Sequence, residues 1–245
     1  MPTEVPQIQQ TAKAQLCATC GQQFQAIFVT APGLGCYFSQ LHCPPCQAKL
    51  RAEQEAAERT REAEARRKAW AELCPVEFRA NDEGGETDPN RLRLEQPKFS
   101  EALRWRFGKT GLLLIGPSGT CKTRVAWRIL RREFEAGRRV VAMKAHGFGV
   151  ECQERRTSKG GFADWYRHLV RVPLLFIDDL GKGRFTDDAE SHFFGLIDER
   201  TENGRPMIIT SNSTGTALKA RMSEDRGEPI IRRLRDYCQT VVFDR

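Results

Sequence analysis

The chain has 245 residues, of which 40% are hydrophobic and 29% are charged, and its formal net charge is +7. This balance is typical of a folded protein in water, and no stretch approaches the roughly 18 apolar residues of a membrane-spanning helix. The N-terminus also lacks the basic and apolar regions of a secretion signal, so we expect a cytoplasmic protein without a membrane partner.

Residues 1–16 are polar, rich in Gln and without periodicity, and we expect them to form a flexible tail. Residues 17–46 follow as a small separate module with two Cys-x-x-Cys pairs. The four cysteines of these pairs are Cys17, Cys20, Cys43 and Cys46. Each pair makes a tight turn whose two thiolates converge on one ion, and clustered cysteines in a reducing compartment favour metal binding over disulfides. The spacing therefore predicts a structural zinc site in a ribbon-like module.

Three other interpretations of this module remain open. Cys36 or His42 is an alternative ligand, and an iron–sulfur cluster is an alternative occupant. Its aromatic residues Phe24, Phe28, Tyr37 and Phe38 suit a docking face, a base-stacking face or a small core. A segment of this size is too small to hold a core without its metal.

Residues 47–73 consist almost entirely of helix formers, with Glu–Arg and Glu–Lys pairs four residues apart. This pattern predicts a charged, semi-rigid connector helix with little apolar face. Residues 74–245 form the remaining domain, and within it residues 81–90 have the composition of a loop.

From about residue 98, short apolar strands alternate with helical stretches. The expected strands are 111–116, 139–145, 173–180, 206–212 and 239–245. The expected helices lie near 122–136, 160–170, 187–203 and, in pieces, 215–237. This alternation predicts a three-layer α/β domain with a five-stranded parallel sheet.

The first expected strand ends in a glycine-rich turn that opens into a helix, which is the context of a phosphate-binding loop. The turn and the helix start are Gly116, Pro117, Ser118, Gly119, Thr120, Cys121, Lys122 and Thr123. In such a loop Lys122 reaches the β- and γ-phosphates of ATP, and Thr123 gives its hydroxyl to Mg²⁺.

Cys121 occupies the position before the lysine, where glycine is usual. We expect it to be tolerated because cysteine is small and a residue that opens a helix normally has a negative φ. The alternative is a degenerate loop that no longer binds nucleotide.

Two later strands end in polar residues. Asp178 and Asp179 follow four apolar residues, at the sheet edge where ligands collect in such folds. Asp178 is a candidate Mg²⁺ ligand and Asp179 a candidate for polarising the attacking water. Asn212 would reach the γ-phosphate if its strand lies between the two strands that carry the earlier motifs. The alternatives are that the aspartates end a strand in a turn and that Asn212 caps a helix.

The segments GPSGTCKT, LLFIDDLG, IITSN and PIIRRLRDYC, in this order, resemble the AAA+ ATPases of the DnaC/DnaI helicase-loader and IstB transposition-helper group. The resemblance makes Lys122 and Thr123 the Walker A pair, Asp178 and Asp179 the Walker B pair, and Asn212 sensor 1. It places the arginine finger, which acts on a neighbouring subunit's ATP, at Arg233, with Arg232 as the alternative.

The chain departs from the AAA+ pattern in two further respects. Asp179 replaces the glutamate of most members, and the sequence ends after the fifth strand, without room for a helical lid. We therefore expect an ATPase that is slow alone and is completed by a neighbouring subunit in a homo-oligomer formed on ATP or DNA.

Residues 146–172 mix arginines with Phe162, Trp165 and Tyr166, a composition that suits single-stranded DNA. The other interpretation is that Phe162, Trp165, Leu169 and Val170 form the buried face of a helix.

DnaI-type loaders carry a zinc-binding N-terminal domain, so the resemblance favours a loader of a replicative helicase onto single-stranded DNA. The alternatives are a transposition helper that selects target DNA and a non-hydrolysing adaptor. A small-molecule kinase fits poorly because no acceptor pocket is visible.

Overall fold

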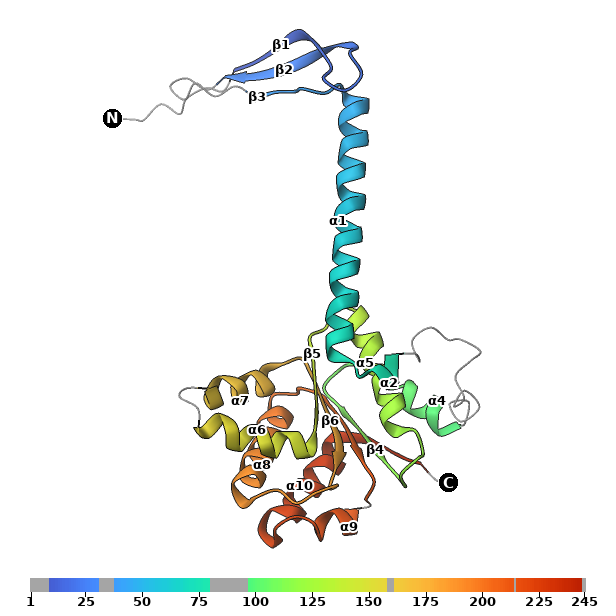
Figure 1. The fold of residues 1–245 in the computed structure, drawn as a ribbon, viewed down its shortest axis with the longest axis vertical. Coiled ribbons are helices and arrows are strands. Elements are labelled where there is room, and N and C mark those ends of the chain that lie inside the picture. Colours follow the sequence, from blue (N-terminus) through green and yellow to red (C-terminus); the bar gives the residue numbers. More distant parts are fainter. Residues whose placement is uncertain (1–8, 31–37, 80–96, 158–160, 214, 244–245) are drawn as a thin grey trace, which may run out of the picture. The chain divides into compact units, whose positions relative to one another are not determined.

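The computed structural model describes residues 9–30, 38–79, 97–157, 161–213 and 215–243. The chain divides into two compact units, Met1–Lys68 and Ala69–Arg245 (Figure 1). Cys36, Tyr37 and the expected loop 81–90 lie outside the described residues.

The first unit contains a small antiparallel sheet in the order β1-β2-β3. Its strands are β1 (Gln9–Leu16), β2 (Gln23–Thr30) and β3 (Phe38–Ser39). Residues 9–16 therefore form a strand where we expected a loose tail. The composition of this segment is polar, but each of its residues pairs with β2, from Gln9 opposite Thr30 to Leu16 opposite Gln23. Pairing with a neighbouring strand has decided its conformation more than its own propensity has.

Helix α1 (Pro44–Leu73) begins three residues before the expected connector, because prolines suit the first turn of a helix. It carries the expected Glu55–Arg59 ion pair at 3.9 Å and a second pair, Lys49–Glu53, at 4.0 Å. Both pairs are exposed, so each adds only about 0.3–0.5 kcal/mol to the helix.

The second unit is built on the predicted five-stranded parallel sheet, in the order β5-β6-β7-β4-β8. The strands are β4 (Gly111–Ile115), β5 (Val140–Lys144), β6 (Leu174–Leu180), β7 (Met207–Ser211) and β8 (Cys238–Val242). Strand β7 lies between β4 and β6, which is the arrangement that the prediction for Asn212 required.

Helices cover both faces of this sheet (Figure 1). One face carries α2 (Val76–Arg79), α4 (Pro97–Leu103) and α5 (Lys122–Glu135). The other carries α6 (Ala145–Thr157), α7 (Gly161–Arg171), α8 (Asp187–Glu202), α9 (Gly215–Lys219) and α10 (Glu224–Tyr237). Helix α6 was not predicted, because Gly147 and Gly149 in its first half lower its helix propensity.

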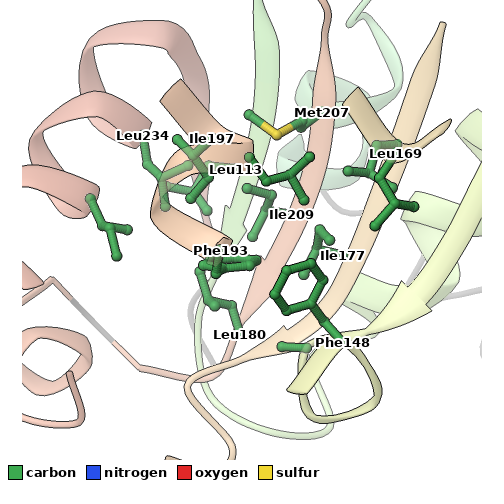
Figure 2. Close-up of a cluster of buried hydrophobic side chains, with 14 of the residues drawn as sticks. Leu113, Phe148, Leu169, Ile177, Leu180, Phe193, Ile197, Met207, Ile209 and Leu234 are labelled. Atoms are coloured by element: carbon green, nitrogen blue, oxygen red, sulfur yellow. The ribbon is translucent and has the colours of Figure 1, made fainter. Parts of the chain in front are cut away.

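Successive side chains of the central strands enter two different hydrophobic cores, as the period of a strand requires. In β4, Leu113 joins the core beneath α6 to α10, whereas Leu112 and Leu114 join the core beneath α4 and α5. Figure 2 shows the first core, where Phe148 and Phe193 lie against Ile177 and Ile209. Strands that are buried on both faces consist of continuous apolar runs. This is why the strand positions could be predicted well from the sequence.

None of the helices described is both long and apolar enough to cross a membrane.

Candidate functional site

The loop between β4 and α5 depends on glycine at two positions. Gly116 has φ +153°, and a Cβ there would lie 2.2 Å from the backbone oxygen of Phe243 in the chain beyond β8. Gly119 has φ +83°, a conformation that other residues rarely adopt. The strand, the turn and the helix therefore form the compact loop predicted from the sequence.

Lys122 opens α5 and its side chain turns back into this loop. Its ammonium donates hydrogen bonds to the backbone oxygens of Gly116 (2.8 Å) and Pro117 (2.7 Å) and to Thr120 Oγ1 (3.2 Å). Burial lowers the pKa of Lys122, while the nearby charges of Asp179 and Asp178 act to raise it. The ammonium is thus held at the position where phosphate oxygens would compete for its hydrogen bonds.

Cys121 adopts a left-handed conformation, with φ 62° and ψ 19°. The expectation of a negative φ at this position was wrong. Backbone N–H groups converge on an anion when residues with right-handed and left-handed backbone angles follow one another. In this loop Cys121, the residue before Lys122, has the left-handed angles. For a residue other than glycine this conformation costs about 1–2 kcal/mol. Cysteine is therefore accommodated here at the expense of local strain.

Asp178 lies at the carboxyl end of β6 and joins two neighbouring elements. Its Oδ1 accepts hydrogen bonds from the hydroxyls of Thr123 in α5 (2.8 Å) and Thr210 in β7 (2.6 Å). Burial raises the pKa of this carboxyl group, and the two hydroxyls partly oppose that rise. A buried carboxylate beside a threonine hydroxyl is a suitable pair of oxygen ligands for a hard cation such as Mg²⁺.

Asp179 is held in place from three sides. Its backbone N–H donates to Thr210 Oγ1 (2.9 Å), its Oδ1 accepts from the Asn212 amide (3.0 Å), and Lys182 lies 3.3 Å from Oδ2. It also has a left-handed backbone, with φ 58°. The predicted aspartate pair and the predicted asparagine are therefore brought together beside the loop.

The sequence did not indicate Thr210 or Lys182 as site residues. Thr210 is buried within an apolar strand, and a single threonine in such a run has no distinguishing pattern. Only the register between β6 and β7 places it against both aspartates.

A cavity of about 480 Å³ adjoins the site. Thr123, Asp178, Asp179 and Lys182 contribute to its polar part, and Phe78, Trp127 and Phe176 contribute to its apolar part.

Arg233 and Arg232 lie on α10 and are not brought to this loop by any contact among the described residues. Arg233 forms an ion pair with Asp198 of α8, and its guanidinium lies 5.9 Å from the centre of the Phe194 ring. Arg232 is exposed. Both arginines are thus placed at the surface of the unit that holds the loop.

The four predicted metal ligands of the first unit form one cluster. The sulfurs of Cys17, Cys20, Cys43 and Cys46 all lie within 4.8 Å of one another. The Cys20–Cys43 sulfur distance is 3.7 Å, close to the roughly 3.8 Å between thiolates that are each 2.3 Å from a tetrahedral zinc ion. The residues therefore fit a closed four-thiolate zinc site.

Local backbone geometry supports this cluster. Gly21 completes the first turn with φ +70°, and its N–H donates to the Cys17 oxygen at 2.9 Å. Burial acts to raise the pKa of Cys17, but backbone N–H groups, that of Cys43 among them, lower it to about 5. His42, the alternative ligand, instead lies 2.9 Å from Thr19 Oγ1 through its Nδ1.

The aromatic residues of the segment between β5 and β6 are partly buried rather than fully exposed. Phe162, Trp165 and Tyr166 pack against the core beneath α6 to α10. Three arginines of this segment form ion pairs, Arg155 with Glu151, Arg156 with Asp188 and Arg167 with Asp164. The expected buried face of the helix is thus formed by Leu169 and Val170, while the aromatic side chains are partly buried beside it.

Residues 54–243 match the sequence profile of a family described as IstB-like ATP binding protein. An insertion-sequence ATP-binding protein of Mycobacterium tuberculosis, Rv3427c, is 29% identical over 116 residues, which are 45% of this chain and 44% of that protein. The chromosomal replication initiator DnaA of Bacteroides thetaiotaomicron is 29% identical over 112 residues, which are 44% of this chain and 23% of DnaA. The chain thus spans less than half the length of these relatives.

Solved structures share the fold of the second unit. The DnaC helicase loader superposes with a TM-score of 0.56 at 18% identity, over 69% of this chain and 99% of that one. DnaA bound to AMPPCP and single-stranded DNA superposes with a TM-score of 0.54 at 22% identity, over 70% of this chain and 50% of that one. At these identities the likeness concerns the fold alone.

Proposed function

The chain belongs to the IstB-like ATP-binding protein family, and from this premise we propose that it is an ATP-dependent switch that loads a replicative helicase onto single-stranded DNA. The observation that carries the nucleotide-dependent part is the convergence of Lys122, Thr123, Asp178, Asp179 and Asn212 at one edge of the sheet. If the loop no longer bound nucleotide, there would be no functional reason for the polar residues at or just after the carboxyl ends of β4, β6 and β7 to meet at one point.

Each residue at this edge has a distinct role in the proposal. The N–H groups from Ser118 to Thr123 surround the phosphates of ATP, and Lys122 exchanges its backbone acceptors for the β- and γ-phosphate oxygens. Thr123 and Asp178 hold Mg²⁺, which supplies charge neutralisation when bound. Asp179 accepts a hydrogen bond from the attacking water, and Asn212 fixes the orientation of that carboxylate.

The described contacts of the site include two lysines, Lys122 and Lys182, but no arginine to stabilise the charge of the transition state. We assign this role to Arg233 of a neighbouring copy, with Arg232 as the alternative, because both lie at the surface of α10. Hydrolysis then depends on a homo-oligomer formed on ATP or DNA, and it is slow in the isolated chain.

The four-cysteine module supports the loader role. Its closed ligand set leaves no open coordination position, so its zinc ion is structural and the module serves for binding a protein partner. The proposed partner is the replicative helicase.

A specific observation favours a second candidate, a transposition helper that selects target DNA. The family profile and the Mycobacterium tuberculosis relative both come from insertion-sequence proteins. This candidate predicts a transposase as the protein partner and duplex DNA as the nucleic acid.

The two candidates are separated by capture of partners from a lysate of the protein's own host, with Mg·ATP present. The loader role predicts that wild-type protein retains a hexameric helicase, identified by mass spectrometry, and that Lys122→Ala does not. Recovery of a transposase without a helicase would replace the loader role with the second candidate. Equal recovery of the same partner by both proteins would instead favour a non-hydrolysing adaptor.

A further inference from the structure

Four cations precede the strands of the second unit at the edge of the sheet opposite the nucleotide site. Since all five strands are parallel, their amino ends share one edge, whereas Gly116, Asp179 and Asn212 lie at the carboxyl edge. Lys109 comes before β4, Arg139 before β5, Arg171 before β6 and Arg205 before β7. We call these four residues the amino-edge row.

The register of the sheet puts members of this row at a common level. The pairs nearest the amino ends of neighbouring strands are Val140–Leu174, Leu175–Met207 and Leu112–Ile208. Continued toward the amino ends, these ladders place Arg139, Arg205 and Lys109 level with one another. Three strand spacings separate β5 from β4, so the row extends over about 14–15 Å. Along one strand of DNA this length corresponds to about four phosphates.

The charges of the row are not neutralised within the described part of the chain. No ion pair there involves Lys109, Arg139, Arg171 or Arg205, and the first three are exposed. The buried carboxylate of Glu133, close in sequence to Arg139, is already shared by Arg132 and Arg138, each at 2.8 Å. At the next strand, β8, the corresponding position holds an acidic residue, Asp236, so the row ends at β4.

A fifth positive charge lies beneath the row. Arg200 is fully buried and donates to the backbone oxygens of Val172 (2.9 Å) and Pro206 (2.8 Å), in the segments that carry Arg171 and Arg205. No carboxylate pairs with it among the described residues. Burial, and next the charge of Arg205, lower the pKa of Arg200 to about 10, so it stays charged at neutral pH. It fixes the two segments and adds to the positive potential above them.

We infer that the amino-edge row binds the phosphate backbone of nucleic acid. This inference rests on the proposed action on DNA, but it assigns that contact to a surface apart from the ATP site. The exposed large apolar side chains among the described residues belong to other segments, so a membrane surface, which needs such groups, does not fit. Arginine and lysine in a row match a ligand recognised by charge and spacing.

Cations at this edge also lie near the carboxyl ends of α5, α7 and α8, where they stabilise the helix dipoles by about 0.3–1 kcal/mol each. If these cations only stabilised helices, replacing them with neutral residues would lower the melting temperature and leave nucleic-acid binding unchanged. Nucleic-acid binding predicts a loss of affinity and a smaller dependence on salt.

The test measures fluorescence anisotropy of a labelled 30-base-pair duplex and of one of its strands, from 50 to 200 mM salt, with full-length protein and Mg·ATP. The variant K109Q/R139Q removes two exposed charges of the row. The variant R61Q/R67Q removes two exposed charges of α1 and serves as the matched control. Melting temperature and ATP affinity are measured for each protein.

For the row variant we expect an affinity about tenfold to a hundredfold lower at 100 mM salt. The slope of log K against log salt should fall by about 1.8 for the duplex and about 1.4 for the single strand. ATP affinity should match that of the wild type, and the control should bind nucleic acid as the wild type does. Inorganic polyphosphate that competes as well as DNA at equal phosphate would show a general polyanion site and would overturn the assignment to nucleic acid.

Wild-type affinity and slope in the row variant would overturn this inference alone. If the wild type binds neither nucleic acid, the proposed action on DNA fails as well. If K109Q/R139Q unfolds, the single variants Lys109→Gln and Arg139→Gln replace it, each with half the change in slope.

Discussion

Thr210 connects the two aspartates of the candidate site, because its hydroxyl donates to Asp178 Oδ1 at 2.6 Å and accepts the backbone N–H of Asp179 at 2.9 Å. One side chain in β7 thus fixes both the proposed metal ligand and the carboxylate proposed to polarise the attacking water, at the end of β6. Its position depends on β7 lying between β6 and β4.

Thr210→Val should impair the Mg²⁺ dependence of ATP binding. The substitution keeps the shape of the side chain but removes both hydrogen bonds, and an unpaired buried polar group costs about 1–3 kcal/mol. We expect the apparent Mg²⁺ affinity, measured by titration with a fluorescent ATP analogue, to fall about tenfold. Thr210→Ser, which keeps the hydroxyl, should remain near the wild type, and equal losses in both variants would contradict this role.

Asp178→Asn should stabilise the Mg²⁺-free protein at neutral pH. Because burial raises the folded-state pKa of Asp178, the neutral carboxyl group contributes stability below its ordinary value of 3.8. That contribution is lost as the pH rises through the raised pKa, and above it the buried charge opposes folding. Asparagine remains neutral throughout and keeps one oxygen for the two hydroxyls.

The measurement is the melting temperature from pH 3.5 to 8, with and without Mg²⁺. Without Mg²⁺ we expect Asp178→Asn to melt above the wild type at pH 7 and at the same temperature as the wild type near pH 3.5. Mg·ATP should raise the melting temperature of the wild type alone. Asp225→Asn removes an exposed carboxylate and is the control; the same pH profile in this variant would refute a specific effect of Asp178.

Cys121→Gly should stabilise the loop. Glycine removes the strain of the left-handed backbone but adds conformational entropy to the unfolded chain, so we expect a net gain of about 0.5–1 kcal/mol in the free energy of unfolding. Cys121→Val should lose stability and ATP affinity, since β-branched residues are rare at positive φ. Thermal unfolding and ATP titration distinguish the two variants, and a valine variant equal to the glycine variant would disprove the strain.

Removal of zinc should unfold the first unit and leave the second able to bind ATP. Purified protein should contain one zinc ion per chain, and a chelator should release it with a loss of strand signal in circular dichroism. Cys17→Ser combined with Cys43→Ser should reproduce the effect. A chain that contains no zinc, or one that contains iron and inorganic sulfide, would overturn the zinc assignment.

The sequence predicted the five strands within one or two residues where the structure describes them, because strands buried on both faces are continuous apolar runs. It also identified the loop, the aspartate pair and Asn212, since each polar group follows such a run directly. The conformation of β1 could not be predicted in this way, because it depends on pairing with β2 rather than on its own composition.

Other features depended on tertiary contacts that no local pattern reveals. Arg200 is charged yet fully buried, because backbone oxygens from two separate segments converge on its guanidinium. Trp165 and Tyr166 resembled a nucleic-acid surface in the sequence, but packing of α7 against α6 and α8 partly buries them. The left-handed backbone of Cys121 follows from the shape of the whole loop.

The most direct test of the ATP switch is sedimentation velocity of the wild type and Lys122→Ala, each without nucleotide, with Mg·ADP and with Mg·ATP. Lys122 has three oxygen acceptors in the loop, and alanine removes the charge that would bind the phosphates. The account predicts that only the wild type with Mg·ATP assembles into larger species. Identical sedimentation of both proteins under all three conditions would contradict it.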